Sequence, residues 1–345
     1  MQIIQVVRHF GPVGGMEEIA WRISCGLAER GFGITILCDE AHCSHGFKGR
    51  IIEFGKRSEK PRWLTHIKFA RQVQSWLREN QSTRQIVHCH EMVPQADILS
   101  VHSTPHGVYE PTVSPKKFDP TWYINRWLEK RVISTAKKVV PYTESHSHQI
   151  QMMHSASKSL LVPPVAPGTE PSDRHRVESR GAIGFMGREW ERKGLRLVMA
   201  IFFRLVSKQP DLRLVIAGVE RQSTKELITY NTNNIQFLGE IKDINQFYDQ
   251  IDILIHPARL EAFGMVVTEA LTRRIPVLVS DRVGASGVVR PENGQVLPIK
   301  ASLEEWTENA RQILRWDPGR IPEYTRSWSS VIEEYMELYK VCRKN

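Results

Sequence analysis

The 345-residue sequence lacks any long apolar segment. The N-terminal apolar run within MQIIQVVRHF is about half a dozen residues long, too short for a signal peptide. No later run approaches the roughly 20 residues of a membrane span. Low-complexity tracts and obvious internal repeats are absent, and the apolar fraction of 41% is that of an ordinary folded protein. We therefore expect a folded chain that stays in the cytoplasm.

Cysteine is scarce and forms no CxxC pair, which indicates reduced thiols rather than a disulfide framework. The five cysteines are Cys25, Cys38, Cys43, Cys89 and Cys342. The segment CDEAHCSHG concentrates possible metal ligands, namely Cys38, His42, Cys43 and His45. Zinc sites, however, usually take paired ligands from two separated segments. We expect no metal ion here or elsewhere in the chain.

Two recognition signatures are also missing. No stretch matches the GxGxxG fingerprint of nicotinamide-dependent dehydrogenases, which disfavours that class. No RNP, zinc-finger or other nucleic-acid recognition sequence occurs, so we expect no nucleic-acid partner. No feature of the sequence specifies an oligomeric state.

The first half of the chain carries an excess of positive charge. The formal net charge is +9, and residues 50–138 contain 16 Lys and Arg against 8 Asp and Glu, so 16 − 8 = +8 lies in that span. The segments GKRSEKPRWLTHIKFARQVQSWLREN and KKFDPTWYINRWLEKR interleave these cations with Trp, Tyr and Phe. This mixture suits an anionic membrane surface. Two ordinary helices with solvated charged faces would have the same composition.

The hydrophobic pattern alternates strands with helices, and it does so twice. In the first half, strands are expected in QIIQVV, GITILCD, QIVHCHE, DILSVHS and KKVVPYTES, and a helix at residues 16–31 places Ile19, Ile23 and Leu27 on one face. In the second half, strands are expected in GAIGFMG, LRLVIAG, IQFLGE, DILIHP and IPVLVSD, with REWERKG as a loop and LRLVMAIFFRLVSKQP as a helix. Residues 160–176 are expected to form a linker. The pattern predicts an α/β protein with two doubly wound, Rossmann-like domains, residues 1–165 and 166–320.

Each half has a loop suited to an anionic or sugar ligand after its first strand. Gly14 and Gly15 open a helix, so the backbone can approach a phosphate or a sugar closely, although a structural turn is the alternative. In GREWERKG, Arg188 and Lys193 flank a strand-to-helix loop, where cations and a helix dipole can hold a diphosphate. A solvated basic loop is the alternative there.

The segment HPARLEAFGMVVTEALTRR places two glutamates near one helix start. Glu261 is expected in a loop and Glu269 on the helix that follows it. Backbone N–H groups at the helix start suit an anionic or hydroxyl-rich ligand, and a carboxylate beside them accepts from sugar hydroxyls. These N–H groups belong to Phe263, Gly264, Met265 and Val266. Spacing alone also allows a surface residue and a helix-face residue without a joint role.

Together, the segments GPVGG, VHCHE, VHST, MGREWERKG, FLGEI and HPARLEAFGMVVTEAL resemble the retaining glycosyltransferases of family GT4. The most specific segment is EAFGMVVTE followed by IPVLVSDRVG, which is similar to the E-x7-E motif of that family and the strand and glycine loop after it. The resemblance implies the GT-B fold, in which two Rossmann-like domains face a cleft. It also implies that residues 321–345 form a helix packing back towards the N-terminal domain, with a simple surface helix as the alternative. The segment GREWERKG and the basic first half look closest to the transferases of the lipopolysaccharide core.

The resemblance also implies roles for individual donor-site residues. Glu269 would accept hydrogen bonds from the ribose hydroxyls, and Glu261 would lie at the donor sugar. Arg188 and Lys193 would neutralise the leaving diphosphate. The remaining donor-binding positions are Gly14, Gly15, Gly187, Ile241, Phe263, Gly264, Met265 and Val266.

Three histidines of the first half each have two possible roles. His102, in VHST, matches a histidine that reaches the transferred sugar, and a hydrogen-bonded structural histidine is the alternative. His88 and His90 alternate onto one strand face and could mimic a metal site. HCHE, however, is also a strand-end sequence of the family.

The function implied is a metal-independent, retaining transfer of a sugar from a nucleoside diphosphate sugar, with a UDP-sugar favoured and no cofactor. The acceptor would be a saccharide or glycolipid of lipopolysaccharide core or other cell-envelope polysaccharide synthesis. The enzyme would be peripheral on the cytoplasmic face of the inner membrane, bound to its anionic surface through the basic first domain. A non-catalytic protein that binds nucleotide sugars or glycolipids and a sugar-nucleotide epimerase remain alternatives.

Overall fold

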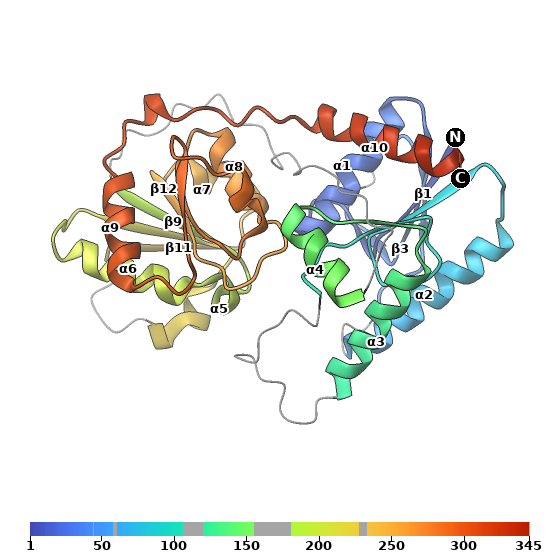
Figure 1. Ribbon diagram of the computed structural model, residues 1–345, viewed down its shortest axis with the longest axis horizontal. Coiled ribbons are helices and arrows are strands. Elements are labelled where there is room, and N and C mark those ends of the chain that lie inside the picture. The colour runs from blue at the N-terminus through green and yellow to red at the C-terminus, as the bar shows by residue number, and fades with distance from the viewer. Residues whose placement is uncertain (44, 58–60, 106–119, 155–180, 228–232, 345) are drawn as a thin grey trace. The chain divides into compact units, whose positions relative to one another are not determined.

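The computed structural model describes residues 1–43, 45–57, 61–105, 120–154, 181–227 and 233–344. The chain divides into two compact units (Figure 1). The first comprises Met1–Val165 and Ser327–Asn345, and the second comprises Ala166–Arg326. The linker expected at residues 160–176 lies outside the described residues. Within the described ranges, no helix combines the length and the apolar character that a membrane crossing requires.

The first unit contains a six-stranded sheet in which every pairing is parallel. Its strands are β1 (Gln2–Val6), β3 (Gly33–Cys38), β5 (Arg50–Glu53), β6 (Gln85–Cys89), β7 (Ile98–Ser100) and β8 (Lys138–Val140). They lie in the order β5-β3-β1-β6-β7-β8, so the chain builds outwards from β1 on one side and then on the other. The order reverses between β1 and β6, and ligands of such sheets bind beyond the carboxyl ends of the strands at this switch point.

Helices cover both faces of the first sheet. The helices are α1 (Gly15–Glu29), α2 (Arg62–Glu79), α3 (Pro120–Thr135), α4 (Glu144–His154) and α10 (Trp328–Lys344). Apolar side chains of α2, α3 and α4 form one core with those of the sheet. On α1 the predicted face of Ile19, Ile23 and Leu27 is buried, as expected. The C-terminal helix α10 packs against α1 (Figure 1), where a Cβ on Gly26 would come within 2.0 Å of Ile332 Cδ1.

The second unit repeats this topology. Its strands are β9 (Ala182–Met186), β10 (Arg213–Ala217), β11 (Ile235–Gly239), β12 (Ile253–His256), β13 (Val277–Ser280) and β14 (Gly294–Leu297). They lie in the order β11-β10-β9-β12-β13-β14, again all parallel, so the switch point lies between β9 and β12. The two doubly wound sheets predicted from the sequence are therefore confirmed.

The helices of the second unit lie on both faces of its sheet as well. They are α5 (Trp190–Lys193), α6 (Leu195–Val206), α7 (Asn245–Tyr248), α8 (Met265–Thr272) and α9 (Leu303–Ile313), with short 3₁₀ turns at Arg221–Leu227, Gly284–Val288 and Pro318–Arg320. Helices α6 and α9 pack together on one core, and α7 packs on the other face at Gly184. The segment REWERKG, expected to be a loop, contains the one-turn helix α5. Gly194 ends that helix with a φ of +85°.

Candidate active site

The loops beyond β9 and β12 meet at the switch point of the second unit. Lys193 ends α5, in the segment that follows β9, and its Nζ lies 3.4 Å from Oε2 of Glu261, in the loop after β12. Nη1 of Arg192 lies 3.3 Å from the same oxygen. The structure thus brings together Lys193 and Glu261, which the sequence singled out. It adds Arg192, whose only signal in the sequence was its place beside Lys193.

Two glycines permit this close arrangement. Gly187 has a φ of +155°, and a Cβ on it would lie 2.3 Å from Cδ of Lys193. Gly264 has a φ of +91°, and a Cβ on it would lie 3.0 Å from Val283 and 3.3 Å from Cγ of Glu261. Larger residues at these positions would strain the backbone and displace Lys193 or Glu261.

The environment of Glu261 keeps its carboxyl group ionised. Only 16% of its side chain is exposed. This burial raises the pKa of the carboxyl, but the charges of Lys193 and Arg192 outweigh it, so the pKa lies below its ordinary value. At neutral pH one carboxylate therefore holds two cations at the edge of the sheet.

His256 is a further polar group of the site, and no motif in the sequence marks it for a role. It ends β12 and is fully buried, with Nε2 3.9 Å from Oε2 of Glu261. Burial, followed by the charge of Lys193, lowers the pKa of His256 to about 3, so the ring is neutral. Neither ring nitrogen has a hydrogen-bond partner among the residues that the structure describes. A buried polar group without a partner costs about 1–3 kcal/mol, which a ligand hydroxyl can recover.

Glu269 lies on α8, which begins immediately after Gly264, as the sequence predicted. Its side chain is buried, and Tyr248 Oη donates a hydrogen bond of 2.7 Å to Glu269 Oε2. The helix start carries Met265 and Val266, and the first N–H groups of a helix have no partner within it. Phe263 is buried just before this start, and its carbonyl accepts from the N–H of Ala285.

Arg188 and Lys193, the basic pair expected from the sequence, contact two different carboxylates. Lys193 contacts Glu261, whereas Arg188 forms an ion pair with Glu240, which directly follows β11. The side chains of Arg188 and Glu240 are 66% and 74% exposed. Such exposed pairs contribute about 0–1 kcal/mol, so little energy holds Arg188 in this position. Ile241 follows Glu240 and is half-buried at the same edge of the sheet.

The first unit presents the glycine loop near its own switch point. Gly14 precedes α1 in an extended conformation, and Gly15 is the exposed first residue of the helix. A Cβ on Gly14 would lie 2.5 Å from Oε2 of Glu17, so the glycine makes room for that carboxylate. Glu91, just beyond β6, is buried, and this raises the pKa of its carboxyl to about 7 even though the charge of Arg8 lowers it. A carboxyl with this pKa can hold or release a proton near neutral pH. No motif in the sequence marks Glu91 for a role.

His102 is the end of a hydrogen-bonded row within the first unit. Its Nε2 lies 2.8 Å from Nδ1 of His90 and 3.2 Å from Oη of Tyr142. Nε2 of His90 lies 2.9 Å from Oε1 of Gln5. Burial, followed by the neighbouring His90, holds the pKa of His102 well below its ordinary value, so the ring is neutral.

The C-terminal helix sets the direction of this row. Gln5 Nε2 donates to Tyr339 Oη at 3.0 Å, so the carbonyl oxygen of Gln5 faces His90. A carbonyl only accepts, and therefore Nε2 of His90 carries its proton while Nδ1 accepts from His102 Nε2–H. Nδ1 of His102 keeps a lone pair that can accept a hydrogen bond from a hydroxyl group.

Protein groups also hold His88. Nδ1 of His88 accepts from Tyr339 Oη at 2.7 Å, and Nε2 donates to Ser100 Oγ at 2.8 Å. Burial lowers the pKa of His88 well below its ordinary value. His88 and His90 are therefore engaged in hydrogen bonds with protein groups and are not arranged as metal ligands.

Two family profiles match the chain, and together they cover most of its length. Residues 13–164 match the profile described as Glycosyltransferase Family 4, which includes Gly14, Gly15 and His102. Residues 170–328 match the profile described as Glycosyl transferases group 1, which includes Lys193, Glu261 and the rest of the second site.

Individual proteins show the same similarity. The lipopolysaccharide glucosyltransferase WaaG of Escherichia coli K12 is 22% identical over 370 aligned residues, which cover 96% of this chain and 94% of that protein. Two further relatives match over a smaller part of their length. The match covers 59% of a D-inositol 3-phosphate glycosyltransferase of Corynebacterium urealyticum and 52% of the lipopolysaccharide core biosynthesis mannosyltransferase LpcC of Rhizobium leguminosarum. A crystal structure of WaaG superposes with a TM-score of 0.78 at 19% identity, covering 99% of this chain and 98% of that one. HepE of Anabaena, solved with UDP and glucose, superposes with a TM-score of 0.69 at 16% identity over 98% of both chains.

Proposed function

Because the two halves of the chain are the family 4 and group 1 domains of a glycosyltransferase, we propose that it transfers a sugar from a nucleoside diphosphate sugar to a saccharide or glycolipid. The observation that carries the proposal is the convergence of Lys193 and Glu261 at the switch point of the group 1 domain. The similarity to WaaG, whose name describes a lipopolysaccharide glucosyltransferase, supports a role in lipopolysaccharide core or other envelope polysaccharide synthesis.

The donor diphosphate would bind the cations beyond β9. Lys193 and Arg192 are already held at one point by Glu261, and Arg188 can leave its exposed partner Glu240 at little cost. As the bond between sugar and phosphate breaks, negative charge develops on the leaving diphosphate, and these cations stabilise it. They supply the charge that a divalent cation provides in other transferases, so we propose that transfer needs no metal ion.

The other donor groups would bind along α8. The ribose hydroxyls would donate to Glu269, whose carboxylate is held in place by Tyr248. The donor sugar would lie at Glu261, where a hydroxyl can also bond to the nitrogens of His256, which have no partner among the described residues. The N–H groups at the start of α8 would receive further oxygen atoms of the donor. UDP is the expected nucleotide, since the similar HepE was solved with UDP and glucose.

We propose that the configuration of the transferred sugar is retained. The acceptor hydroxyl would attack the face from which the diphosphate departs, and an oxygen of the diphosphate would take the proton of that hydroxyl. The lone pair on His102 Nδ1 would accept a hydrogen bond from a sugar hydroxyl, because the row from Tyr339 through Gln5 and His90 fixes this tautomer.

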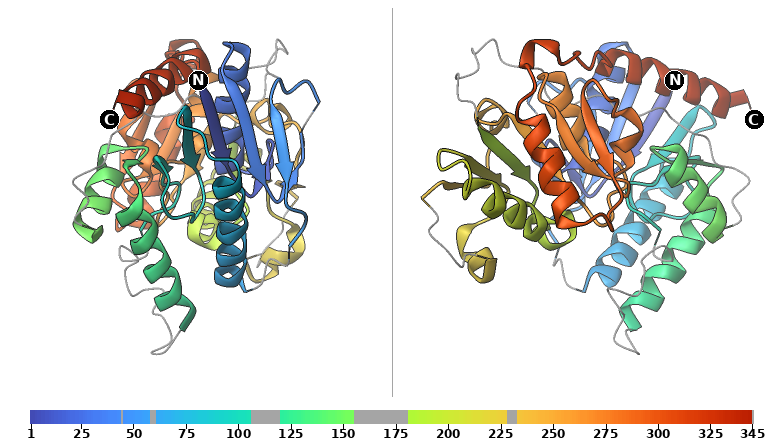
Figure 2. Two further views of the ribbon diagram at one scale, coloured as in Figure 1. Left: turned by 90° about the vertical axis from the view of Figure 1, so that its right-hand side faces the viewer. Right: turned by 60° about the vertical axis from the view of Figure 1, so that its left-hand side comes forward.

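An anionic membrane is the proposed docking surface of the first unit. On α3, Tyr123 and Trp127 are 60% and 56% exposed, and the guanidinium carbon of Arg131 lies 5.5 Å from the centre of the Trp127 ring. Helix α2 packs beside α3 (Figure 2). It exposes Lys68 and Arg71. Cations beside exposed aromatic rings suit lipid headgroups. All five cysteines are free thiols, which supports the reducing cytoplasmic side of the inner membrane.

Calorimetric binding of UDP, GDP and ADP, each with and without EDTA, tests the donor site in the wild-type protein and in Glu269→Ala. We expect one diphosphate to bind equally well in EDTA and the variant to lose at least about tenfold in affinity, because a buried acceptor for two hydroxyls is removed. If no diphosphate binds, or if binding requires a divalent cation, the proposed donor site is wrong.

Product analysis with the matching nucleotide sugar separates transfer from the alternatives. A transferase releases free nucleoside diphosphate in proportion to glycosylated acceptor. An epimerase isomerises the nucleotide sugar without an acceptor, and a non-catalytic binder does neither. Lipopolysaccharide core fragments truncated at successive sugars are the acceptors to use, and the configuration of the new bond by NMR tests retention.

A further inference from the structure

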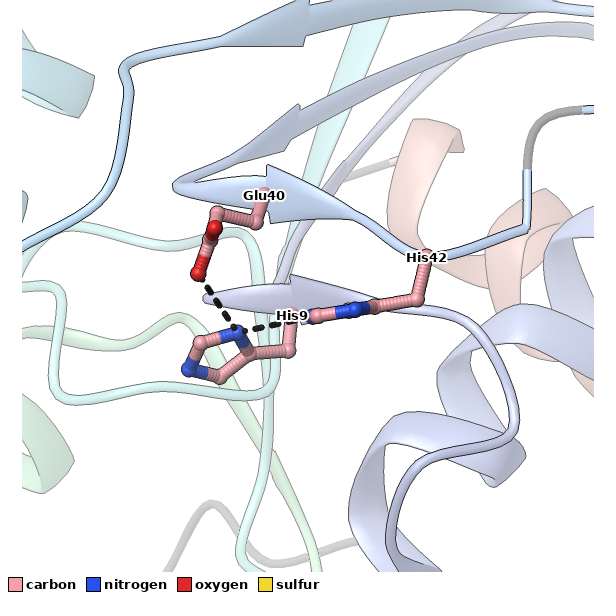
Figure 3. A group of neighbouring side chains, drawn as sticks. All are labelled: His9, Glu40 and His42. Carbon is pink, nitrogen blue, oxygen red and sulfur yellow. Dashed lines mark hydrogen bonds and ion pairs between the residues drawn. The ribbon is translucent and has the colours of Figure 1, made fainter. Parts of the chain in front are cut away.

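A small parallel ladder in the first unit brings two histidines and a glutamate together. Strand β2 (His9–Phe10) pairs with β4 (Glu40–Ala41), with His9 opposite Glu40. His42 directly follows β4, and its N–H donates to the Phe10 carbonyl at 2.8 Å. Because residues two apart on an extended strand point to the same side, His42 shares the face of Glu40. Figure 3 shows the three side chains pointing toward one another.

The separations fit a single metal ion. Nδ1 of His9 lies 3.2 Å from Nε2 of His42 and 3.9 Å from Oε2 of Glu40 (Figure 3). The ligand atoms of all three lie within 4.8 Å of one another. A tetrahedral ion with ligands at about 2.0–2.1 Å holds its ligand atoms roughly 3.3 Å apart. The two shorter separations lie on either side of this value, so small side-chain rotations would place the three atoms around one ion.

The backbone around the ladder positions these side chains in advance. The carbonyl of Arg8 accepts from the N–H groups of Asp39 at 2.8 Å and of Glu40 at 3.2 Å. The guanidinium of Arg8 pairs with Asp39 at 2.9 Å, and Arg57 occupies the other oxygen of Asp39 at 2.6 Å. Arg8 and Arg57 are thus both paired with the buried carboxylate of Asp39, the residue before Glu40.

We propose that His9, Glu40 and His42 form a binding site for one Zn²⁺ ion, with water as the fourth ligand. Two imidazoles and a carboxylate are a donor set that zinc takes in proteins. His42 is exposed, and His9 and Glu40 are partly exposed, which leaves access for the ion and the water. The group shares only His42 with the cluster considered from the sequence. Cys38 is buried, and its Sγ lies 3.8 Å from the Ile52 carbonyl.

The ion would fasten the loop that connects β1 to α1. His9 lies in this connection upstream of Gly14 and Gly15. Gly11 has a φ of +143° and packs against the segment after β4, because a Cβ on Gly11 would lie 3.2 Å from both Cys43 N and His42 Cβ. Zinc would therefore bind the glycine loop to the segment after β4. This role is structural and independent of the transfer reaction, for which the proposal needs no metal ion.

Zinc binding to the full, tag-free chain tests the site directly. After EDTA treatment and removal of the chelator, Zn²⁺ is titrated against a chromophoric competitor at pH 7.5. We expect one equivalent with a dissociation constant of about 1 µM or lower. His9→Ala, Glu40→Gln and His42→Ala should each weaken binding at least about tenfold. His45→Ala, which removes an exposed histidine outside the group, is the matched control and should bind like the wild type.

Two further measurements make the result decisive. Co²⁺ bound in place of zinc should show the intense visible bands of tetrahedral coordination, and these should be lost in His42→Ala. Thermal midpoints in EDTA show whether the variants fold. If a histidine variant does not fold, the test rests on Glu40→Gln, which preserves the volume of the side chain. Zinc binding weaker than about 100 µM in the wild type, or equal binding by Glu40→Gln and His45→Ala, would overturn the site. Neither outcome decides nucleotide binding, which is measured separately, both with and without EDTA.

Discussion

At the scale of single residues, Glu261 organises the site of the group 1 domain. One of its oxygens lies within 3.4 Å of both Lys193 Nζ and Arg192 Nη1. Long cationic side chains normally lose rotamer freedom when they bind an anion. Here the carboxylate has already ordered them, so less of that entropy is lost when a diphosphate arrives.

Lys193 and Glu269 should differ in what their removal changes. Lys193→Met removes a cation that acts mainly on the leaving diphosphate, and we expect kcat to fall about 10²-fold or more with a smaller loss of affinity. Glu269→Ala should chiefly weaken nucleotide binding. Steady-state kinetics and calorimetry on both variants test the division. Equal losses of affinity with unchanged turnover in both would contradict these roles.

The stability that Glu261 contributes should depend on pH. Its pKa lies below the ordinary 4.5, so the ionised form stabilises the folded state above that pH, and this contribution disappears as pH falls through the lowered pKa. Glu261→Gln leaves Lys193 and Arg192 without their shared partner. We expect it to cost about 1–3 kcal/mol at pH 7 and progressively less below about pH 4.5.

Urea unfolding at pH 7, 5.5 and 4 checks this expectation. Glu240→Gln is the matched control because Glu240 forms an ion pair in which both side chains are mostly exposed, and its removal should change stability little at any of these pH values. A loss for Glu261→Gln that stays constant from pH 7 to pH 4 would mean that the ionised carboxylate is not its source.

At the scale of elements, α10 links distant parts of the first unit. It packs on α1, where Arg30 Nη2 donates to Ser329 Oγ at 2.7 Å. From the same helix, Tyr339 reaches Gln5 on β1 and His88 on β6, on either side of the switch point. A helix at the end of the chain thus determines the hydrogen-bonding of groups in the middle of the sheet.

Tyr339→Phe should therefore change the tautomer of His102 indirectly, through Gln5 and His90. The variant removes the acceptor that orients the Gln5 amide, so the amide can turn and reverse the tautomers of His90 and His102. We expect the Nδ1 of His102 to become protonated and kcat to fall about 2- to 10-fold, the effect of one neutral hydrogen bond. Nitrogen-15 chemical shifts of the histidine rings report the tautomer.

Tyr335→Phe is the control for Tyr339→Phe. It removes a hydroxyl from the same buried face of α10, where the Tyr335 ring stacks on His88. If both variants reduce turnover equally and leave the His102 tautomer unchanged, the effect is one of packing, and the assigned role of Tyr339 is wrong.

At the scale of the whole molecule, charge is distributed unevenly along the chain. Of the net +9, +8 falls within residues 50–138, all in the first unit. On α2 the cations Lys68 and Arg71 are exposed, while Phe69 and Val73 face the core. An amphipathic element of this kind can bind an anionic surface without unfolding.

The double variant Lys68→Glu/Arg71→Glu should weaken binding to anionic vesicles about tenfold or more at low salt, since each cation near such a surface contributes about 1 kcal/mol. The difference should shrink at 0.5 M NaCl because salt screens exposed charges. Liposome flotation measures both effects. Arg204→Glu/Lys208→Glu, at the end of α6 in the second unit, makes the same charge change and should have little effect. Unchanged flotation of the first variant would contradict membrane binding through α2.

The sequence by itself determined the elements that depend on local pattern. Apolar runs bounded by glycine predicted the main strands, a four-residue repeat predicted the buried face of α1, and Gly264 marked the start of α8. The short edge strands β5 and β14 and the one-turn helix α5 escaped prediction. Each is too short for a periodic signal and exists because of its neighbours, which are β3 and β13 for the two strands and Gly194 for the helix.

Only the tertiary structure decided which side chains meet. Arg192, His256, Tyr248 and Tyr339 carry no signal that distinguishes them in the sequence, because their roles arise from contacts with residues 5 to 334 positions away. Lys193 and Glu261, 68 positions apart, could be proposed separately from their motifs. Their contact follows from the strand order, since parallel strands on either side of a switch point end at the same edge.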